Sequence, residues 1–325
     1  IASGKFSGFN KFLSKSKNEL WLLDKRKERS DLINQQGIIV EGVSGNWQAK
    51  VKTTVNLKEI GKADLIIICV KSFDTKEALQ NAKILLKENT KVLTLQNGMG
   101  NIEVLGELAG YDNVIAGSTN EGATLLSVGR VRHAGRGETI IGLMNGKIPV
   151  EMRSIREIFN KAGLEIMISR DIKSILWSKL ITSAGINALT AITRLHNGKL
   201  ISFEWTRKIL REVITEAVKI AKRKRIKLIY DDPLAKVEAV CEATATNVSS
   251  MLQDVLRKKR TEIDFINGEI ANQAKLGNGR GAAVKATFGV NNPARSFVHD
   301  TLRVDRVANQ LAIGFILRVV YLNAN

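Results

Sequence analysis

Short apolar runs alternate with amphipathic segments in the first half of the chain, a pattern typical of a parallel sheet flanked by helices. The clearest expected strands are Leu20–Leu23, Leu65–Val70 and Val92–Leu95. Between the last two, Asp74–Leu86 carries its apolar residues at helical spacing. This succession predicts a βαβ crossover within an α/β, Rossmann-like domain over residues 1–168.

Long helical periodicity replaces this pattern after a polar break. It continues through Ile175–Ile192, Phe203–Arg225 and Leu234–Ala274, so an all-helical domain is expected over residues 169–276. Residues 277–325 begin with a glycine-rich break and show only weak periodicity. We assign this divergent tail no structure.

The composition is that of a folded two-domain chain. It has 325 residues, 44% of them hydrophobic and 25% charged, enough to bury a sizeable interior. No run of about twenty apolar residues and no secretory signal pattern appears, so a cytoplasmic location without a membrane partner is expected. Cys69 and Cys241 are too few for a disulfide framework and lack metal-ligand spacing. We interpret both as buried thiols and expect no metal site.

The net charge of +18 raises the question of an acidic partner, either nucleic acid or a phosphorylated cofactor. The basic residues are scattered along the chain. Clusters such as Lys222–Arg225 and Arg257–Arg260 stand within helical patterns and lack interleaved aromatic residues. A solvated helix face therefore explains them better, and no nucleic-acid partner is expected.

A line of polar residues runs along the apolar helix expected from Ile175 to Ile192. Lys179, Ser183 and Asn187 fall at i, i+4 and i+8, so they share one face. From spacing alone, a satisfied structural network or a narrow solvent-facing edge is favoured. The functional alternative is a cleft lined by one ionisable group and two hydrogen-bonding groups.

A second polar line lies upstream of Thr261–Gly268, on what is expected to be one continuous helix. Its members are Asn247, Ser250 and Asp254. Glu262 stands among apolar neighbours, and it would face Lys179 across a cleft if this helix packed against the first. The pattern alone favours an ordinary, partly exposed glutamate.

Two loops follow strand ends, where open parallel sheets bind their ligands. Val70–Phe73 follows the second expected strand and Gln96–Asn101 follows the third. The glycines of the second loop permit close approach of a ligand to the backbone, and Lys71 and Asn97 can contact a phosphate, ribose or amide. Taken singly, each loop is an ordinary turn after a strand.

Seven segments, taken in order along the chain, resemble the ketopantoate reductase family. They are Val70–Ser72, Gln96–Gly100, Trp177–Leu180, Asn187–Thr190, Asn197–Leu200, Asn247–Asp254 and Thr261–Gly268. The resemblance implies an N-terminal Rossmann domain that holds NADPH and a helical C-terminal domain that closes over the keto acid. The implied reaction reduces 2-dehydropantoate to pantoate, a step of pantothenate and coenzyme A biosynthesis.

The resemblance also implies roles for individual residues. Lys179 matches the proton donor, and Glu262 would hold its ammonium group and lie beside the cofactor. Lys71, Asn97 and Ala123 match cofactor contacts. The positions implied to contact substrate are Lys179, Ser183, Asn187, Asn197, Asn247, Ser249 and Ser250.

The N-terminus departs from the family, which has a first strand and a Gly-x-Gly-x-x-Gly turn there. Counted without gaps or with a one-residue slip, the three glycine positions fall on Ile1, Ser3 and Phe6 or on Ala2, Gly4 and Ser7. The first strand and the glycine-rich fingerprint are therefore missing or altered, which compromises the pyrophosphate site.

The choice of cofactor and substrate stays open at three positions. A carboxylate such as Asp24 at the end of the second strand commonly favours NAD, whereas Lys25 and Arg26 can pair the 2′-phosphate of NADP. We favour NADP, with NAD as the alternative. Ser183 replaces an asparagine usual in the family, so a related 2-keto acid reductase is an alternative, as is a degenerate member with impaired nucleotide binding. The expected partner is a small keto acid, and a homodimer is compatible with the resemblance.

Overall fold

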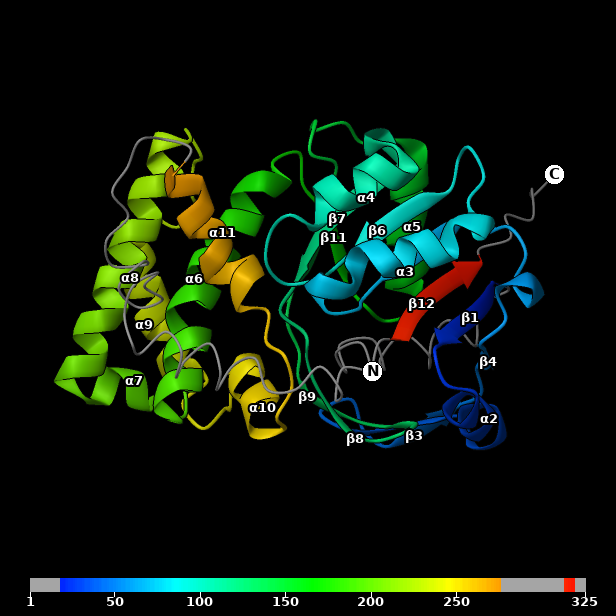
Figure 1. Ribbon diagram of the computed structural model, residues 1–325, viewed down its shortest axis with the longest axis horizontal. Coiled ribbons are helices and arrows are strands. Elements are labelled where there is room, and N and C mark those ends of the chain that lie inside the picture. Colours follow the sequence, from blue (N-terminus) through cyan, green and yellow to red (C-terminus); the bar gives the residue numbers. More distant parts are fainter. Residues whose placement is uncertain (1–17, 276–312, 319–325) are drawn as a thin grey trace. The chain divides into compact units, whose positions relative to one another are not determined.

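The structure is a computed structural model, and it describes residues 18–275 and 313–318 (Figure 1). The chain divides into two compact units. Among the described residues, the sheet unit comprises 18–96, 101–172 and 313–318, and the helical unit comprises 97–100 and 173–275. The loop 97–100 therefore belongs to the helical unit although the residues on both sides of it belong to the sheet unit.

An eight-stranded sheet forms the core of the sheet unit, in the order β11-β10-β7-β6-β5-β12-β1-β4. Its strands are β1 (Glu19–Asp24), β4 (Lys52–Thr54), β5 (Leu65–Ile68), β6 (Lys91–Thr94), β7 (Val114–Thr119), β10 (Thr139–Gly142), β11 (Ile166–Ile168) and β12 (Ile313–Arg318). The pairs β1–β4, β5–β6, β6–β7 and β10–β11 are parallel. The expected α/β fold and the crossover between β5 and β6 are confirmed.

Helices cover both faces of this sheet. They are α2 (Lys27–Gln36), α3 (Thr75–Asn81), α4 (Asn101–Ala109) and α5 (Val150–Lys161), with 3-10 turns η2 (Leu57–Glu59), η3 (Ser72–Asp74), η4 (Ala82–Leu85) and η5 (Tyr111–Asn113). Successive residues of a strand face opposite sides. Leu65 accordingly lies in one buried cluster with Phe159 of α5, and Ile66 in another with Leu105 of α4. Burial on both faces explains the unbroken apolar run of β5.

The strand β12 lies between β1 and β5 and runs antiparallel to both (Figure 1). Its register pairs Asp24 with Ile313 and Leu65 with Leu317. The sequence assigns the tail no structure, because a six-residue segment with four apolar side chains does not reveal a partner strand so distant in the chain. The expected glycine positions, between Ile1 and Ser7, lie outside the described residues.

A second sheet in the same unit was not anticipated from the sequence. Its order is β3-β2-β9-β8, with β2 (Ile38–Gly42), β3 (Trp47–Ala49), β8 (Gly122–Ser127) and β9 (Arg130–Gly135). A short turn at Val128 and Gly129 joins β8 to β9, and Gly129 has a positive φ of 71°. A glycine turn between two strand-like segments is a recognisable hairpin signal.

The segment Asp74–Leu86 is not the single helix predicted from its periodicity. It begins as the turn η3, becomes α3 and tightens into η4. The carbonyl groups at its end accept hydrogen bonds from outside the helix: Leu85 from the Ala63 amide (2.9 Å) and Leu86 from Lys62 Nζ (2.7 Å). These bonds satisfy the carbonyls without a further helical turn.

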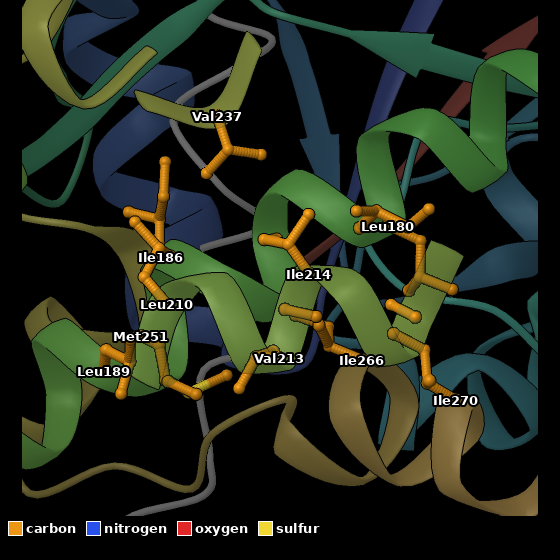
Figure 2. Close-up of a cluster of buried hydrophobic side chains, with 14 of the residues drawn as sticks. Leu180, Ile186, Leu189, Leu210, Val213, Ile214, Val237, Met251, Ile266 and Ile270 are labelled. Carbon is orange, nitrogen blue, oxygen red and sulfur yellow. The ribbon is translucent and has the colours of Figure 1, made fainter. Parts of the chain in front are cut away.

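The helical unit confirms the all-helical expectation. Its described helices are α6 (Ile172–Thr193), α7 (Lys199–Ser202), α8 (Glu204–Arg223), α9 (Pro233–Ala243), α10 (Ser250–Leu256) and α11 (Ile263–Lys275). Side chains from α6, α8 and α11 meet in one buried cluster (Figure 2). Leu180, Ile214 and Ile266 are among its members.

The prediction of one continuous helix from Leu234 to Ala274 was wrong, because this segment forms three helices. Ser249 caps α10, since its Oγ accepts from the Leu252 amide at 3.1 Å. After α10, Lys258 adopts a left-handed backbone with φ of 52°. Caps and left-handed residues end helices without interrupting apolar periodicity.

Of the described helices, α6 alone has the length and composition of a membrane span, and 61% of its most apolar window is buried. A core helix of a folded domain meets the same criteria. Within residues 18–275 and 313–318, no group of three or more potential His, Cys, Asp or Glu ligands gathers to hold a metal ion. Cys69 and Cys241 are both buried thiols, as predicted.

Candidate functional site

A polar network joins the loop that follows β5 to the end of β6. Gln96 Nε2 donates to the Val70 carbonyl (2.7 Å) and to Thr75 Oγ1 (2.8 Å). The Val70 carbonyl immediately precedes Lys71, which is partly buried and has an extended backbone. Gln96 therefore fixes the position of Lys71 at the carboxyl end of the sheet.

A buried part of this network lies behind the loop. Thr75 Oγ1 donates to Asn101 Oδ1 (2.8 Å), and Asn101 Nδ2 donates to Ser72 Oγ (3.1 Å). All three side chains are buried. The sequence analysis gave none of them an individual role; the available signal was that all three lie within seven residues after the end of β5 or β6.

The loop that contains Asn97 is fixed to the first turn of α11 within the helical unit. The Met99 amide donates to the Phe265 carbonyl at 2.9 Å. Gly98 has a φ of +80°, and a Cβ there would lie 2.6 Å from the Phe265 carbonyl oxygen. Glu262, only 5% exposed, accepts the Phe265 amide on its own carbonyl (3.0 Å). The loop that contains Asn97 therefore lies beside the first turn of α11, which Glu262 immediately precedes. Glu262 is buried, whereas the sequence pattern alone favoured a partly exposed glutamate.

The polar line on α6 has the predicted placement. Lys179, Ser183 and Asn187 are each partly buried, and they extend over two helical turns, about 12 Å. Asn267 of α11 donates from Nδ2 to the Ala184 carbonyl (3.0 Å). This bond holds the start of α11 against the middle of α6.

Two of the expected substrate residues meet beyond the end of α6. The Asn197 amide donates to the Asn247 carbonyl (3.1 Å), and Asn197 Nδ2 donates to Thr244 Oγ1 (2.9 Å). Asn197 is 7% exposed, and its buried Oδ1 has no hydrogen-bond partner among the described residues. Such an acceptor is costly unless a ligand or water satisfies it.

Ser249 and Thr190 connect this loop to α6. Their hydroxyl oxygens lie 2.7 Å apart and both side chains are buried. Thr190 Oγ1 also donates to the Asn187 carbonyl (3.0 Å). The Ser249 hydroxyl therefore helps to hold this loop against α6. Ser250, the next residue, is exposed.

The remaining expected cofactor residues lie in the sheet unit. Ala123 of β8 pairs with His133 of β9. Lys25 follows β1, is exposed, and its Nζ lies 2.7 Å from Glu77 Oε1 of α3. Arg26, partly buried, precedes α2. Lys25 and Lys71 therefore stand at the carboxyl ends of β1 and β5, with α3 beside both.

Comparison with known proteins covers both units. The family model described as "Ketopantoate reductase PanE/ApbA" matches residues 7–146, and the model of the C-terminal domain of that family matches residues 171–286. A 2-dehydropantoate 2-reductase of Pyrococcus horikoshii is 40% identical over 253 residues, which is 78% of this chain and 82% of the relative. That of Halobacterium salinarum is 32% identical over 257 residues, 78% of this chain and 84% of the relative.

Solved structures show the same fold. A PanE/ApbA family ketopantoate reductase from Ralstonia eutropha superposes with a TM-score of 0.82 at 29% identity, covering 93% of this chain and 96% of that one. A D-mandelate dehydrogenase bound to NADH and anilino(oxo)acetate superposes with a TM-score of 0.81 at 24% identity, covering 93% and 96%. At that identity the second likeness concerns the fold alone.

Proposed function

This chain belongs to the ketopantoate reductase family, and on that premise we propose that it reduces 2-dehydropantoate to pantoate with NADPH and with Lys179 as the proton donor. The observation that carries the proposal is the arrangement within the helical unit. There, hydrogen bonds of Asn267, Thr190 and Asn197 connect α6 to the helix that follows the buried Glu262, and connect the two loops that carry Asn197 and Ser249 to α6 and to each other.

The proposed role of Lys179 follows from the charge that develops on the ketone oxygen. When bound, NADPH supplies the hydride that the carbonyl carbon accepts. The Lys179 ammonium donates a proton to the carbonyl oxygen and stabilises the negative charge there. Glu262 orients that ammonium. This role is supported by the burial of Glu262 and by its place just before α11, the helix whose Asn267 donates a hydrogen bond to α6.

The proposed substrate contacts use amide and hydroxyl groups. Asn187, Asn197 and Ser250 bind the hydroxyl and carboxylate groups of the keto acid, with Asn247, Ser249 and Ser183 in the same region. The unsatisfied buried Oδ1 of Asn197 supports a ligand there. The shorter Ser183 favours, as a second candidate, a related 2-keto acid as substrate.

The residues proposed for the cofactor are Lys71, Asn97, Ala123, Lys25, Arg26 and Glu262. A phosphorylated dinucleotide fits the basic end of β1, where Lys25 and Arg26 precede the buried Arg29, whose Nη1 has no hydrogen-bond partner among the described residues. Lys71 and Asn97 would bind the nucleotide through a cationic group and an amide. The hydrogen bond from Gln96 to the Val70 carbonyl, which fixes the backbone next to Lys71, supports this assignment.

The test is NADPH oxidation by the full chain with 2-dehydropantoate, phenylglyoxylate and 2-ketoisovalerate, with pantoate identified as product. We expect kcat/KM for 2-dehydropantoate to exceed the others by at least about 10-fold, since each lost polar contact costs on the order of 1–3 kcal/mol. Preference for another acid would support the second candidate. Absence of saturable NADPH binding by fluorescence would instead support a degenerate member of the family.

A further inference from the structure

A buried ion pair closes the carboxyl end of β1. Asp24, the last residue of the strand, is 2% exposed, and Arg29 of α2 is 5% exposed. Nε and Nη2 of Arg29 each donate to both Asp24 carboxylate oxygens, at 2.6–3.1 Å. The Arg26 amide also donates to Asp24 Oδ1 (3.0 Å). Both carboxylate oxygens are therefore engaged within the protein.

This pairing removes a group that would otherwise select the cofactor. In Rossmann domains a carboxylate at the end of the second strand accepts the ribose 2′-hydroxyl of NAD, and its charge opposes the 2′-phosphate of NADP. Here the guanidinium of Arg29 neutralises the carboxylate of Asp24. The carboxylate is also buried, so a ribose hydroxyl could reach it only by displacing Arg29.

Cationic groups remain beside the neutralised pair. Lys25 is exposed, and its ion pair with Glu77 is a surface contact that an incoming phosphate can replace at little cost. Arg26 is partly buried at the same strand end. The Nη1 amino group of Arg29 is itself buried and has no hydrogen-bond partner among the described residues.

We propose that Arg29 is a positioning residue that sets the preference for NADPH over NADH, because it holds Asp24 in a buried pair and leaves Lys25 and Arg26 to meet the 2′-phosphate. This inference rests on the proposed use of NADPH. It adds to that proposal a residue that the sequence pattern did not single out.

The experiment measures dissociation constants of the full chain for NADPH and NADH by nucleotide fluorescence, for wild type, Arg29→Met and Asp24→Asn. Wild type is expected to bind NADPH more tightly. Arg29→Met frees the Asp24 carboxylate, so the ratio of the NADH to the NADPH constant is expected to fall at least about 10-fold, equivalent to about 1.4 kcal/mol. If Arg29 had a structural role alone, Arg29→Met would weaken the binding of both nucleotides equally.

Asp24→Asn decides the question if Arg29→Met does not fold, because it leaves no buried carboxylate unpaired. Since the carboxylate is already neutralised, this variant is expected to keep the wild-type ratio within about 2-fold. A selective loss of NADH affinity of about 10-fold or more in Asp24→Asn would show that the ribose already uses the carboxylate, and would overturn the inference. An unchanged ratio in folded Arg29→Met would do the same.

Failure of the proposed function has a different signature. Wild-type protein that binds neither nucleotide overturns the use of a nicotinamide cofactor, and with it the role of Arg29. Wild-type protein that binds NADH as tightly as NADPH overturns the role of Arg29 alone, because the reduction can then proceed with either nucleotide.

Discussion

Gly98→Ala adds one methyl group to the loop that carries Asn97. The backbone there has a φ of +80°, which costs an L-residue about 1–2 kcal/mol. The new Cβ would lie 2.6 Å from the Phe265 carbonyl oxygen, which cannot rotate away. The loop must then shift and weaken the bond from the Met99 amide to that oxygen, which contributes about 0.5–1.5 kcal/mol. Together these effects lower the free energy of unfolding by about 1.5–3.5 kcal/mol.

Gly100→Ala is the matched control, because Gly100 has a similar φ of +89° and a Cβ there meets nothing within 4 Å. It should lose only the backbone contribution. Urea unfolding of both variants, followed by circular dichroism, separates the two effects, and NADPH titration should show weaker binding for Gly98→Ala because Asn97 moves. Equal stability of the two variants within about 0.5 kcal/mol would refute the reasoning, since the contact with Phe265 would then contribute nothing measurable.

Three further perturbations address the two units separately. Ser249→Ala loses the cap of α10 and the contact with Thr190, so urea unfolding should show a loss of about 1–3 kcal/mol, with exposed Ser250→Ala within about 0.5 kcal/mol of wild type; similar losses would contradict the cap. Burial, together with the negative charges of Glu238 and Glu242, raises the pKa of Cys241 to about 11. A disulfide reagent at pH 8 should therefore label this thiol only as the protein unfolds; rapid labelling of Cys241 in the native protein would disprove its burial. A chain ending at Gln310 lacks β12 and leaves β1 and β5 without their shared neighbour, so its melting temperature should fall by at least about 5 °C; unchanged melting would mean that β12 is dispensable for the sheet.

Elements with long, regular periodicity were predictable from the sequence. The strands β5 and β6 and the helix α6 carry apolar residues, most of them buried, and such patterns can be recognised without knowledge of the tertiary fold. The polar face of Lys179, Ser183 and Asn187 followed from helical spacing alone. Its assignment to chemistry required the family resemblance.

Features that depend on distant partners were not predictable. β12 is defined by strands far away in the chain, and the breaks around α10 depend on the local cap of Ser249 and the left-handed Lys258. The position of Asp24 at a strand end was anticipated, but its engagement by Arg29 was not. Pairing of two side chains is set by packing, which one sequence does not display.

The proton-donor role of Lys179 is tested most directly by the turnover of Lys179→Ala in NADPH oxidation with 2-dehydropantoate. Exposed Lys173→Ala, near the start of the same helix, is the matched control. We predict that kcat falls by about 100-fold or more in Lys179→Ala, since a positioned acid typically contributes that much, while the dissociation constant for NADPH changes little and Lys173→Ala behaves as wild type. Near-normal turnover of Lys179→Ala would contradict the assignment.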